Sequence, residues 1–321
     1  MNASTYSVTV TRKAIEALDI CSFELVGGAE SPLPPFSAGS HIDVHLPNGM
    51  TRQYSLCNDS SEGHRYLIAV LKDPASRGGS KAIHELVSQG DTLQISAPKN
   101  HFALAHEAKR SLLIAGGIGI TPILCMAERL ETAGEEFELH YCARSRDRMA
   151  FRDRIQRSAF VSKASFHFDD GDAAQRLQLD KLLASPQPGT QLYVCGPKGF
   201  MDAVLSKARS SGWPQAQLHY EFFAAEVVKS DSDDSFEVKL ASSGKVVRVA
   251  KDVTVTQALA EAGIEVPTSC EQGVCGTCLT RVLEGQPDHR DMYLSPEEQA
   301  ANDQFLPCCS RSKSARLVLD L

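Results

Sequence analysis

The stretch Cys270-Glu271-Gln272-Gly273-Val274-Cys275-Gly276-Thr277-Cys278 decides the interpretation of this 321-residue chain. Its spacing, C-x4-C-x2-C, is followed about thirty residues later by the adjacent pair Cys308 and Cys309. That spacing is typical of a plant-type [2Fe-2S] cluster. Three thiolates of one loop surround a cluster only if the backbone turns sharply, and the glycines at 273 and 276 permit the positive φ that this requires. The sequence therefore predicts an iron–sulfur centre whose fourth ligand is Cys308 or Cys309.

Zinc is the alternative occupant, because four thiolates also form structural zinc sites. Such sites usually use two C-x2-C pairs, whereas this chain has one, Cys275 and Cys278. The spacing therefore favours iron and sulfide. Half of the ten cysteines lie singly elsewhere, which does not suggest a disulfide framework: Cys21, Cys57, Cys125, Cys142 and Cys195.

Length and composition exclude several classes of protein. With 42% hydrophobic and 23% charged residues, the chain is long enough for two or three globular domains. Its net charge of −7 comes without a basic cluster, so we expect no nucleic-acid partner. The longest apolar run, residues 112–127, is shorter than the ~20 residues of a membrane span. The first ten residues lack the pattern of a secretory signal, so we expect a cytoplasmic protein that does not bind membranes.

The hydrophobic pattern divides the chain into three domains and a linker. Residues 1–105 contain short alternating segments between Gly, Pro and Asn turns, which predicts an antiparallel β-barrel. Residues 106–225 alternate strand and helix patterns, which predicts an α/β domain with a parallel sheet. Residues 226–235 are strongly polar and predict a linker. Residues 236–321 begin with a hairpin pattern and form the third domain.

Individual elements follow from the same pattern. In the first domain we expect strands at 7–11, 41–46, 52–56 and 66–71. In the second, we expect strands at 112–115, 137–142 and 191–195, with helices at 122–132 and 200–210. In the third, we expect strands at 236–240, 246–249 and 317–321, with a helix at 255–262.

A glycine-rich turn, residues 115–122 with the sequence AGGIGITP, follows the first strand of the second domain. Thr121 suits the N-cap and Pro122 the first turn of the next helix, so the free N–H groups of that helix point toward the turn. Such a helix end favours a dinucleotide pyrophosphate. The third glycine of G-x-G-x-x-G is missing, so the pattern alone leaves an ordinary tight turn open.

A second turn, Tyr193-Val194-Cys195-Gly196-Pro197, ends a later strand of the same domain. Ligands of open parallel sheets gather at this edge. Gly196 permits a flat ring to approach the backbone, and Pro197 fixes the turn. Taken alone, Cys195 also fits a small buried hydrophobic residue.

A third segment, Arg52-Gln53-Tyr54-Ser55-Leu56, is a candidate flavin-binding segment. A hydride carries two electrons, whereas a plant-type cluster accepts one, so a flavin is needed between a pyridine nucleotide and the cluster. The later run 76–80 (SRGGS) offers backbone amides and the Ser80 hydroxyl to a phosphate. Considered without the other motifs of the chain, Tyr54 fits an ordinary packing residue of a strand, and Gly78-Gly79 fits an ordinary loop.

In this order, R-x-Y-S, GGIGITP, YVCGP and the cysteine loop resemble the phthalate dioxygenase reductase family over nearly the whole chain. The resemblance implies a flavin-binding barrel, a pyridine-nucleotide domain and a plant-type ferredoxin domain with the β-grasp fold. It implies FMN, since relatives with an amino-terminal ferredoxin domain use FAD. It implies NADH as the donor, although Arg146 close to Arg144 leaves NADPH open.

The resemblance also assigns roles to residues, with Ser55 and Cys195 as the catalytic pair. Arg52 would hold the flavin phosphate, Tyr54 would pack beside the ring, and Ser55 would lie near N5. The flavin set is Arg52, Gln53, Tyr54, Ser55, Ala69, Val70, Leu71, Gly78, Gly79, Ser80 and Phe223. The nucleotide set is Gly117, Gly119, Thr121, Pro122, Arg144, Cys195, Gly196 and Pro197. The cluster set is Cys270, Cys275, Cys278 and Cys308, which leaves Cys309 as an extra, packed thiol. Leu71 departs from the family, where phthalate dioxygenase reductase carries a basic residue, so its contact would be through the backbone.

These assignments predict a monomeric reductase that passes electrons from NADH through FMN and a [2Fe-2S] cluster to a separate Rieske-type oxygenase, which would bind the aromatic substrate. Two alternatives stay open. In one, the flavoenzyme reduces a quinone or a cytochrome directly. In the other, the cysteine-rich tail makes the protein a zinc-binding adaptor, and metal analysis separates this from the first two.

Overall fold

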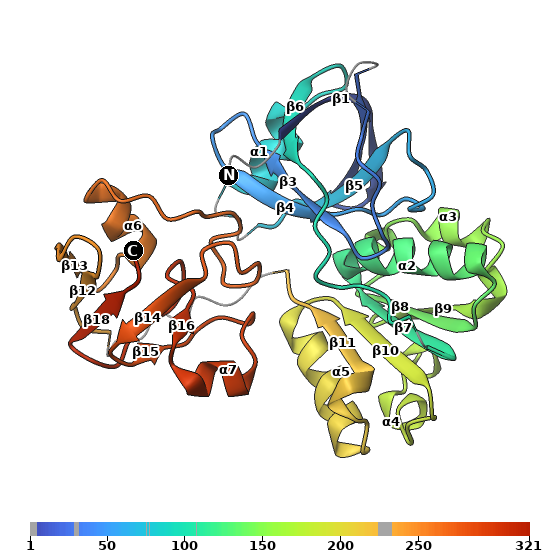
Figure 1. Ribbon diagram of the computed structural model, residues 1–321. Coiled ribbons are helices and arrows are strands. Elements are labelled where there is room, and N and C mark those ends of the chain that lie inside the picture. The colour runs from blue at the N-terminus through green and yellow to red at the C-terminus, as the bar shows by residue number, and fades with distance from the viewer. Residues whose placement is uncertain (1–4, 29–31, 75, 77, 107, 224–232) are drawn as a thin grey trace. The chain divides into compact units, whose positions relative to one another are not determined.

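The computed structural model describes residues 5–28, 32–74, 76, 78–106, 108–223 and 233–321 (Figure 1). The chain divides into two compact units, Met1–Glu221 and Phe222–Leu321. Most of the expected linker, residues 226–232, lies outside the described residues. The fold class expected from the sequence is confirmed, with an antiparallel barrel, a parallel α/β sheet and a β-grasp domain in chain order.

The barrel is a six-stranded antiparallel sheet in the order β4-β3-β6-β1-β2-β5. An isolated bridge between Leu56 and Ile68 joins the two edge strands and closes the sheet. Its core contains buried aliphatic and aromatic side chains from alternating positions of every strand. The strands are β1 (Thr5–Ala17), β2 (Ile20–Gly27), β3 (His41–His45), β4 (Thr51–Ser55), β5 (Tyr66–Leu71) and β6 (Thr92–Ser96).

Three elements of the barrel were not expected from the sequence. The sequence pattern predicts neither β2 nor β6, and α1 (Gly79–Leu86) begins inside the run predicted as a phosphate loop. Ala82 and Ile83 of α1 pack into the barrel core. This packing, rather than helix propensity alone, explains why so short a helix forms.

The second sheet is wholly parallel, in the order β11-β10-β7-β8-β9, as predicted (Figure 1). Helix α2 connects β7 to β8, its neighbour on one side in the sheet. Helix α5 connects β10 to β11 and so runs in the opposite direction across the sheet. Right-handed crossovers therefore place α2 and α5 on opposite faces of the sheet. The elements are β7 (Arg110–Gly116), α2 (Ile120–Ala133), β8 (Phe137–Ala143), α3 (Arg152–Gln156), β9 (Ala164–Phe168), α4 (Leu179–Leu182), β10 (Thr190–Cys195), α5 (Lys198–Ser210) and β11 (Leu218–Glu221).

The predicted N-cap at Thr121 is wrong. A 3-10 turn, Gly117–Gly119, runs directly into α2, so the cap is Gly119 and Thr121 already lies inside the helix. The Thr121 hydroxyl donates to the Ile118 carbonyl at 3.0 Å. Because the turn and the helix share one winding sense, no side-chain cap is needed, and Pro122 becomes the third helical residue.

The second unit contains a five-stranded mixed sheet in the order β13-β12-β18-β14-β16. The first and last strands in the chain order of the unit, β12 and β18, pair in parallel at its centre, as in a β-grasp fold. A capping box at Thr254 begins α6, which packs on this sheet. The elements are β12 (Phe236–Leu240), β13 (Val246–Val249), α6 (Val255–Glu261), β14 (Thr280–Glu284), β15 (Pro287–Asp288), α7 (Pro296–Ala301), β16 (Gln304–Phe305), β17 (Arg311–Ser312) and β18 (Arg316–Leu319).

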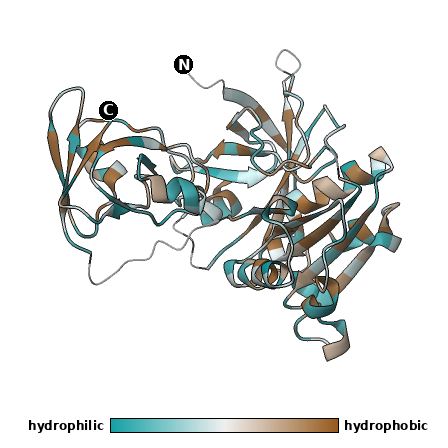
Figure 2. Cartoon of the chain, turned by 60° about the horizontal axis from the view of Figure 1, so that its bottom comes forward, coloured by the Kyte–Doolittle hydropathy of each residue, from teal (hydrophilic) through white to brown (hydrophobic). Residues whose placement is uncertain are grey.

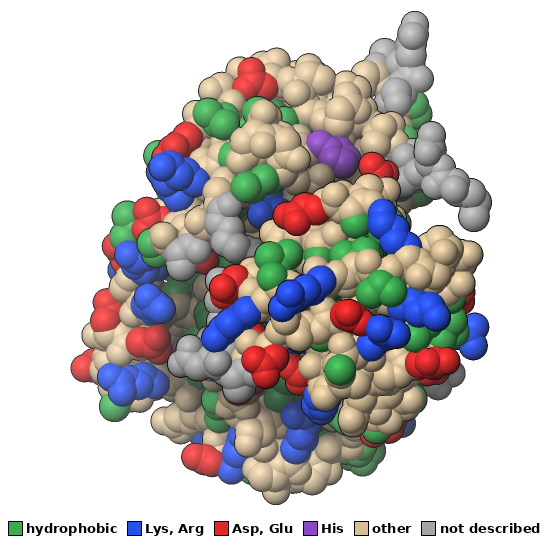
Figure 3. All heavy atoms as spheres, turned by 90° about the vertical axis from the view of Figure 1, so that its left-hand side faces the viewer, with side chains coloured by type: hydrophobic (Ala, Val, Ile, Leu, Met, Phe, Trp, Pro, Cys, Tyr) green, Lys and Arg blue, Asp and Glu red, His purple; other side chains and the backbone are tan. Residues whose placement is uncertain are grey.

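Hydrophobic residues concentrate on the strands and on the helix faces that cover them (Figure 2). On the face drawn in Figure 3, lysine and arginine side chains are interspersed with aspartate and glutamate side chains. Among the described residues, no helix combines the length and the apolar character that crossing a membrane requires.

Candidate functional site

Two glycine-containing turns of the parallel sheet meet backbone to backbone. They follow neighbouring strands, β7 and β10, at the edge where the direction of the crossovers reverses. A Cβ atom on Gly119 would lie 2.3 Å from the Cys195 carbonyl oxygen and 2.6 Å from the Gly196 nitrogen. Gly117 has φ of +54° and faces open space. The two turns predicted to bind one nucleotide therefore form one surface, with Gly117 exposed toward a ligand.

Glu221 joins this surface to the barrel. It ends β11, where its register partner on β10 is Cys195. The Ser55 hydroxyl at the end of β4 lies near its carboxylate, and His41 Nδ1 of β3 is 3.9 Å from its Oε1. Its Oε2 is buried and has no hydrogen-bond partner in the part of the chain that the structure describes. The two predicted catalytic residues, Ser55 and Cys195, thus both face the same carboxyl group.

A series of contacts between polar side chains extends from Glu221 and His41 into the barrel. Gln53 Nε2 lies 3.4 Å from His41 Nε2 and donates to Asp43 Oδ1 at 3.1 Å. Asp43 also accepts a hydrogen bond from Lys99 Nζ at 2.7 Å. The amide of Gln53, predicted to contact flavin, is therefore already engaged inside the protein.

Burial sets the protonation states at this site. Burial raises the pKa of Glu221 to about 8, and the nearby Ser55 hydroxyl only partly opposes the rise. Burial lowers the pKa of His41 to about 4, with a further contribution from His101. Burial and Glu221 together raise the pKa of Cys195 well above its ordinary value. At neutral pH the carboxyl and the thiol hold their protons and the imidazole is neutral, so the site carries no net charge from these groups.

A second cradle lies at the start of α1. Gly78 has φ of +105° and precedes the helix. The first turn of α1 contains no acidic residue that would repel an anion from its N–H groups. The Arg52 side chain lies against Gly79, where a Cβ would be 2.6 Å from Arg52 Nε. A guanidinium beside a helix N-terminus fits a phosphate monoester such as that of FMN. The Ser80 hydroxyl accepts from the Asp73 N–H at 3.1 Å. Arg77, part of the predicted phosphate run, lies outside the described residues.

The other predicted flavin residues lie on strands around this cradle. Tyr54 is partly buried against the barrel core. Ala69 and Val70 are buried in β5, and the Val70 carbonyl lies 2.8 Å from His84 Nε2. Strand β5 also contacts the Gly117–Gly119 turn, which brings the barrel beside the nucleotide surface. Phe223 falls in the second unit, so its role stays a prediction.

Arg144 stands apart from the meeting turns. It follows β8, its side chain is exposed, and its carbonyl accepts from the Asp170 N–H at 3.1 Å. A site at the end of β8 is the next position along the carboxyl edge of the sheet. Its contact with a nucleotide stays a prediction.

The four cysteines predicted as ligands are buried, and their side chains lie close to one another. The Cys270 side chain interacts with Cys275, and the Cys308 side chain interacts with both Cys278 and Cys309. These contacts lower the pKa values of Cys275 and Cys308 and raise those of Cys270, Cys278 and Cys309. Among the described residues, no three His, Cys, Asp or Glu side chains converge as ligands of a single ion. These buried thiols have the spacing that plant-type [2Fe-2S] clusters use.

Backbone and hydroxyl groups surround these sulfurs. The Gln272 N–H donates to Cys270 Sγ at 3.3 Å, and Cys275 Sγ lies 3.2 Å from the Thr277 hydroxyl. Hydrogen bonds to sulfur are one of the factors that set a cluster's potential. Cys309 is buried beside this loop, and its thiol contacts the Leu306 carbonyl at 3.6 Å.

The two glycines of the cysteine loop have no room for a side chain. Gly273 and Gly276 both have φ of +71°, as the sequence predicted. A Cβ on Gly276 would lie 2.3 Å from Tyr293 Cζ, and one on Gly273 would lie 2.4 Å from Cys309 Sγ. Cys309 therefore packs against the loop at Gly273, and its assignment as the extra thiol stays a prediction.

Sequence reasoning missed Glu221 as a site residue. The residue was visible in the run Tyr220-Glu221-Phe222-Phe223 at the end of the second domain, but only Phe223 was singled out. A carboxylate at the end of a strand in an otherwise apolar edge is the available signal. Its burial against Cys195 and Ser55 depends on the packing of barrel against sheet, which a linear sequence does not reveal.

Comparison with known proteins gives matches over the whole chain. The family described as 2Fe-2S iron-sulfur cluster binding domain matches residues 238–313. The family described as dimethylamine monooxygenase subunit DmmA-like, N-terminal domain, matches residues 95–218. The chain is 55% identical to vanillate O-demethylase oxidoreductase of Pseudomonas sp. (strain HR199 / DSM 7063) over 98% of this chain and 99% of that protein.

Two further relatives cover nearly all of both chains. Tetrachlorobenzoquinone reductase of Sphingobium chlorophenolicum is 45% identical over 99% of this chain and 98% of that protein. A solved structure titled as phthalate dioxygenase reductase, a modular structure for electron transfer from pyridine nucleotides to [2Fe-2S], matches with a TM-score of 0.80 and 39% identity. It covers 99% of this chain and 98% of that chain.

We predict that Gly276→Ala lowers the iron content of the purified protein several-fold. Its Cβ would collide with the Tyr293 ring that covers the loop, and the positive φ of Gly276 is unfavourable for alanine, so the ring or the loop between Cys275 and Cys278 must move. Gly263→Ala is the matched control, because Gly263 also has positive φ but nothing lies within 4 Å of the added atom. Iron and acid-labile sulfide are measured in both variants, and equal losses would contradict the steric argument.

We predict that Cys308→Ala abolishes cluster assembly, whereas Cys309→Ala retains it. Cys308 interacts with Cys278, whereas Cys309 contacts Cys308 and packs against the position of Gly273 and the Leu306 carbonyl. The visible absorption of each purified variant provides the measurement. An intact cluster in Cys308→Ala would assign the fourth ligand to its neighbour.

We predict that Glu221 contributes a loss of thermal stability as pH rises from 5 to 9, and that Glu221→Gln removes this contribution, so that the variant gains stability relative to wild type as pH rises. The raised pKa means that the folded state binds more protons than the unfolded state between the ordinary glutamate value and about 8, so stability is lost as Glu221 ionises. The loss is on the order of 5 kcal/mol. Melting temperatures across this range test it, with exposed Glu135→Gln as the control. Equal slopes in wild type and Glu221→Gln would refute the assignment.

Proposed function

The chain belongs to the phthalate dioxygenase reductase family, and from that premise we propose that it is the reductase component of an aromatic oxygenase or O-demethylase system. It takes electrons from NADH and passes them through FMN and a [2Fe-2S] cluster to a separate Rieske-type oxygenase. The observation that carries the proposal is a loop of buried cysteines with C-x4-C-x2-C spacing, in a chain related over nearly its full length to an O-demethylase oxidoreductase.

The proposed cofactor sites follow from residues already described. Arg52 and the start of α1 hold the FMN phosphate, and β4 and β5 hold the ring. The turns around Gly119 and Cys195 hold the pyrophosphate and the nicotinamide of NADH. When bound, FMN supplies the conversion of one hydride into two single-electron transfers.

The side chains at the junction control protons rather than electrons. Oxidation of one NADH to NAD⁺ releases two electrons and one proton, and the cluster accepts only the electrons. The proton must therefore leave a buried site. Glu221 holds a proton at neutral pH, and its neighbours Ser55 and His41 lie on either side of its carboxyl group. We assign Glu221 to hold and release this proton, and Ser55 to orient the ring near N5.

Cys195 serves as a wall of this site rather than as a nucleophile. Its thiol is fully buried and its pKa is raised, so the thiolate is not populated at neutral pH. Its backbone contacts Gly119, which fixes the distance between the two turns. A small, neutral side chain at this position leaves room for a flat ring.

We further propose that the protein is monomeric and cytoplasmic and that the aromatic substrate binds to the oxygenase. The proposed domains are the flavin-binding barrel at 1–105, the nucleotide domain at 106–225 and the ferredoxin domain at 236–321. The linker at 226–235 joins the last two. NADH is favoured over NADPH because the family resemblance implies it.

A second candidate function is direct reduction of a quinone. The relative named tetrachlorobenzoquinone reductase favours it, since it matches this chain over nearly its full length. In that case the cluster would not be essential to the physiological reaction. The two functions are separated by removing one ligand of the cluster.

We predict that Cys275→Ser leaves anaerobic reduction of FMN by NADH within about twofold of wild type but abolishes electron delivery to the oxygenase. The barrel and the nucleotide turns lie in a different unit from the loop, so hydride transfer does not need the cluster. Stopped-flow absorbance measures the first reaction and product formation by the oxygenase measures the second. Cys309→Ser is the matched control and retains both activities. Full oxygenase turnover in Cys275→Ser would contradict electron delivery through the cluster.

A further inference from the structure

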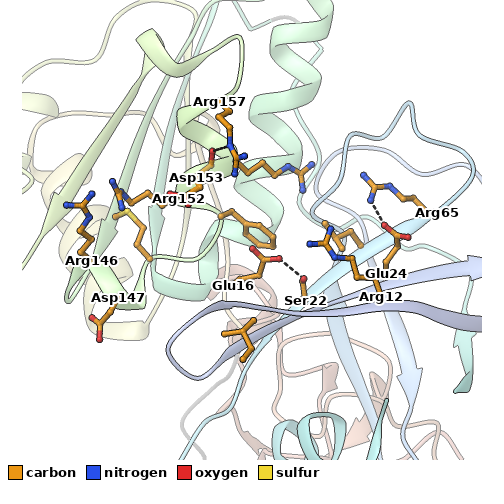
Figure 4. Close-up of a pocket in the computed structure, with 15 residues that line it drawn as sticks. Arg12, Glu16, Ser22, Glu24, Arg65, Arg146, Asp147, Arg152, Asp153 and Arg157 are labelled. Atoms are coloured by element: carbon orange, nitrogen blue, oxygen red, sulfur yellow. Dashed lines mark hydrogen bonds and ion pairs between the residues drawn. The ribbon is translucent and has the colours of Figure 1, made fainter. Parts of the chain in front are cut away.

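A cavity of about 540 Å³ lies on the far side of β1 and β2 from the barrel core (Figure 4). Strands β1 and β2 supply one wall and α3, with the turn Arg146–Arg148, supplies the other. All of its lining residues belong to the first unit. The volume lies in the range of small-molecule sites.

Arginine dominates the charged lining. Six arginines and four carboxylates face the cavity: Arg12, Arg65, Arg146, Arg152, Arg154 and Arg157, with Glu16, Glu24, Asp147 and Asp153. Two of the carboxylates are occupied, because Glu24 binds Arg65 and Glu16 accepts from the Ser22 hydroxyl at 2.6 Å. The walls therefore carry an excess of positive charge.

Half of these guanidinium groups make no hydrogen bond or ion pair with a described residue, although Arg12 lies close enough to Glu24 to help lower the pKa of that carboxyl. Arg65 pairs with Glu24 and Glu62, and Arg154 pairs with Glu128. Arg157 donates to the backbone carbonyl of Asp153. Within the described ranges, no hydrogen bond or ion pair involves the side chains of three of them, namely Arg12, Arg146 and Arg152. Three unpaired guanidiniums around one cavity focus a positive potential inside it.

The turn before α3 is strained in a way that shapes this cavity. Phe151 has φ of +57°, a left-handed conformation that is unfavourable for a residue with a Cβ. It is buried, and the Arg154 guanidinium lies 5.8 Å from its ring centroid. The next residue, Arg152, begins the helix and lines the cavity. Strain of this kind concentrates at functional sites.

The cavity is separate from the proposed cofactor sites. Its lining includes none of the glycine-rich turn, Cys195, Glu221 or the start of α1. Arg144 is also absent from the lining, although Arg146, two residues later, is present. The ligand of this cavity is therefore not the pyrophosphate of NADH or the phosphate of FMN.

We propose that this cavity binds a small oxyanion with at least two negative charges, either a phosphate ester or a di- or tricarboxylate. Arg12 reaches it from the barrel, and Arg146 and Arg152 reach it from the nucleotide domain. Planar guanidiniums pair with two oxygens of such groups at once, which lysine would not do. A bound anion bridges the two domains of the first unit and stabilises their packing.

Isothermal titration calorimetry with sodium pyrophosphate and with citrate, each at constant ionic strength adjusted with sodium chloride, tests the proposal. We expect saturable binding of at least one of the two to wild type, accompanied by a rise in melting temperature. Preference for pyrophosphate identifies a phosphate ester as the ligand class, and preference for citrate identifies a polycarboxylate.

Arg12→Gln and Arg152→Gln should each weaken this binding by about tenfold or more. Arg129→Gln is the matched control, since Arg129 is exposed on α2 and lies outside the cavity, and it should bind as wild type. No binding to wild type, or binding that persists unchanged in both cavity variants, would overturn the proposal. Reduction of FMN by NADH should be unaffected by Arg152→Gln, which separates this test from that of the proposed function.

Discussion

The absence of a Cβ atom at a few positions is the constraint on which all three sites depend. Gly119 lets the two nucleotide turns touch, Gly79 lets Arg52 lie against the start of α1, and Gly276 lets Tyr293 cover the cysteine loop. At each position an added Cβ would lie within 2.6 Å of another atom, a distance that real Cβ atoms do not adopt. These close approaches bring charged groups, backbone amides and sulfurs near enough to hold anionic cofactors.

The chemistry of the two units is complementary. At the junction in the first unit, burial keeps Glu221 and Cys195 protonated and His41 neutral, so the site suits a neutral ring that transfers hydride. In the second unit, neighbouring groups lower the pKa values of Cys275 and Cys308, and the Gln272 N–H donates to Cys270 Sγ.

Local patterns in the sequence predicted much of the fold, because these elements are specified by nearby residues. The hairpin 236–240 and 246–249 matches β12 and β13, and the C-x4-C-x2-C spacing predicted the positive φ of both loop glycines. Elements stabilised by tertiary packing were missed. Helix α1 depends on Ala82 and Ile83 entering the barrel core, and the role proposed for Glu221 depends on barrel packing against sheet. The predicted N-cap at Thr121 was wrong because a 3-10 turn leads directly into α2, so the helix begins before Thr121.

The most direct test of the central claim, that this chain carries a flavin and a two-iron cluster in electronic contact, is electron paramagnetic resonance of the purified protein after anaerobic reduction by NADH. The account predicts two irons and two acid-labile sulfides per chain, FMN in the supernatant after denaturation, and a signal of a reduced [2Fe-2S] centre that appears with NADH. A protein that contains zinc instead of iron, or whose cluster stays oxidised when NADH has reduced the flavin, would contradict it.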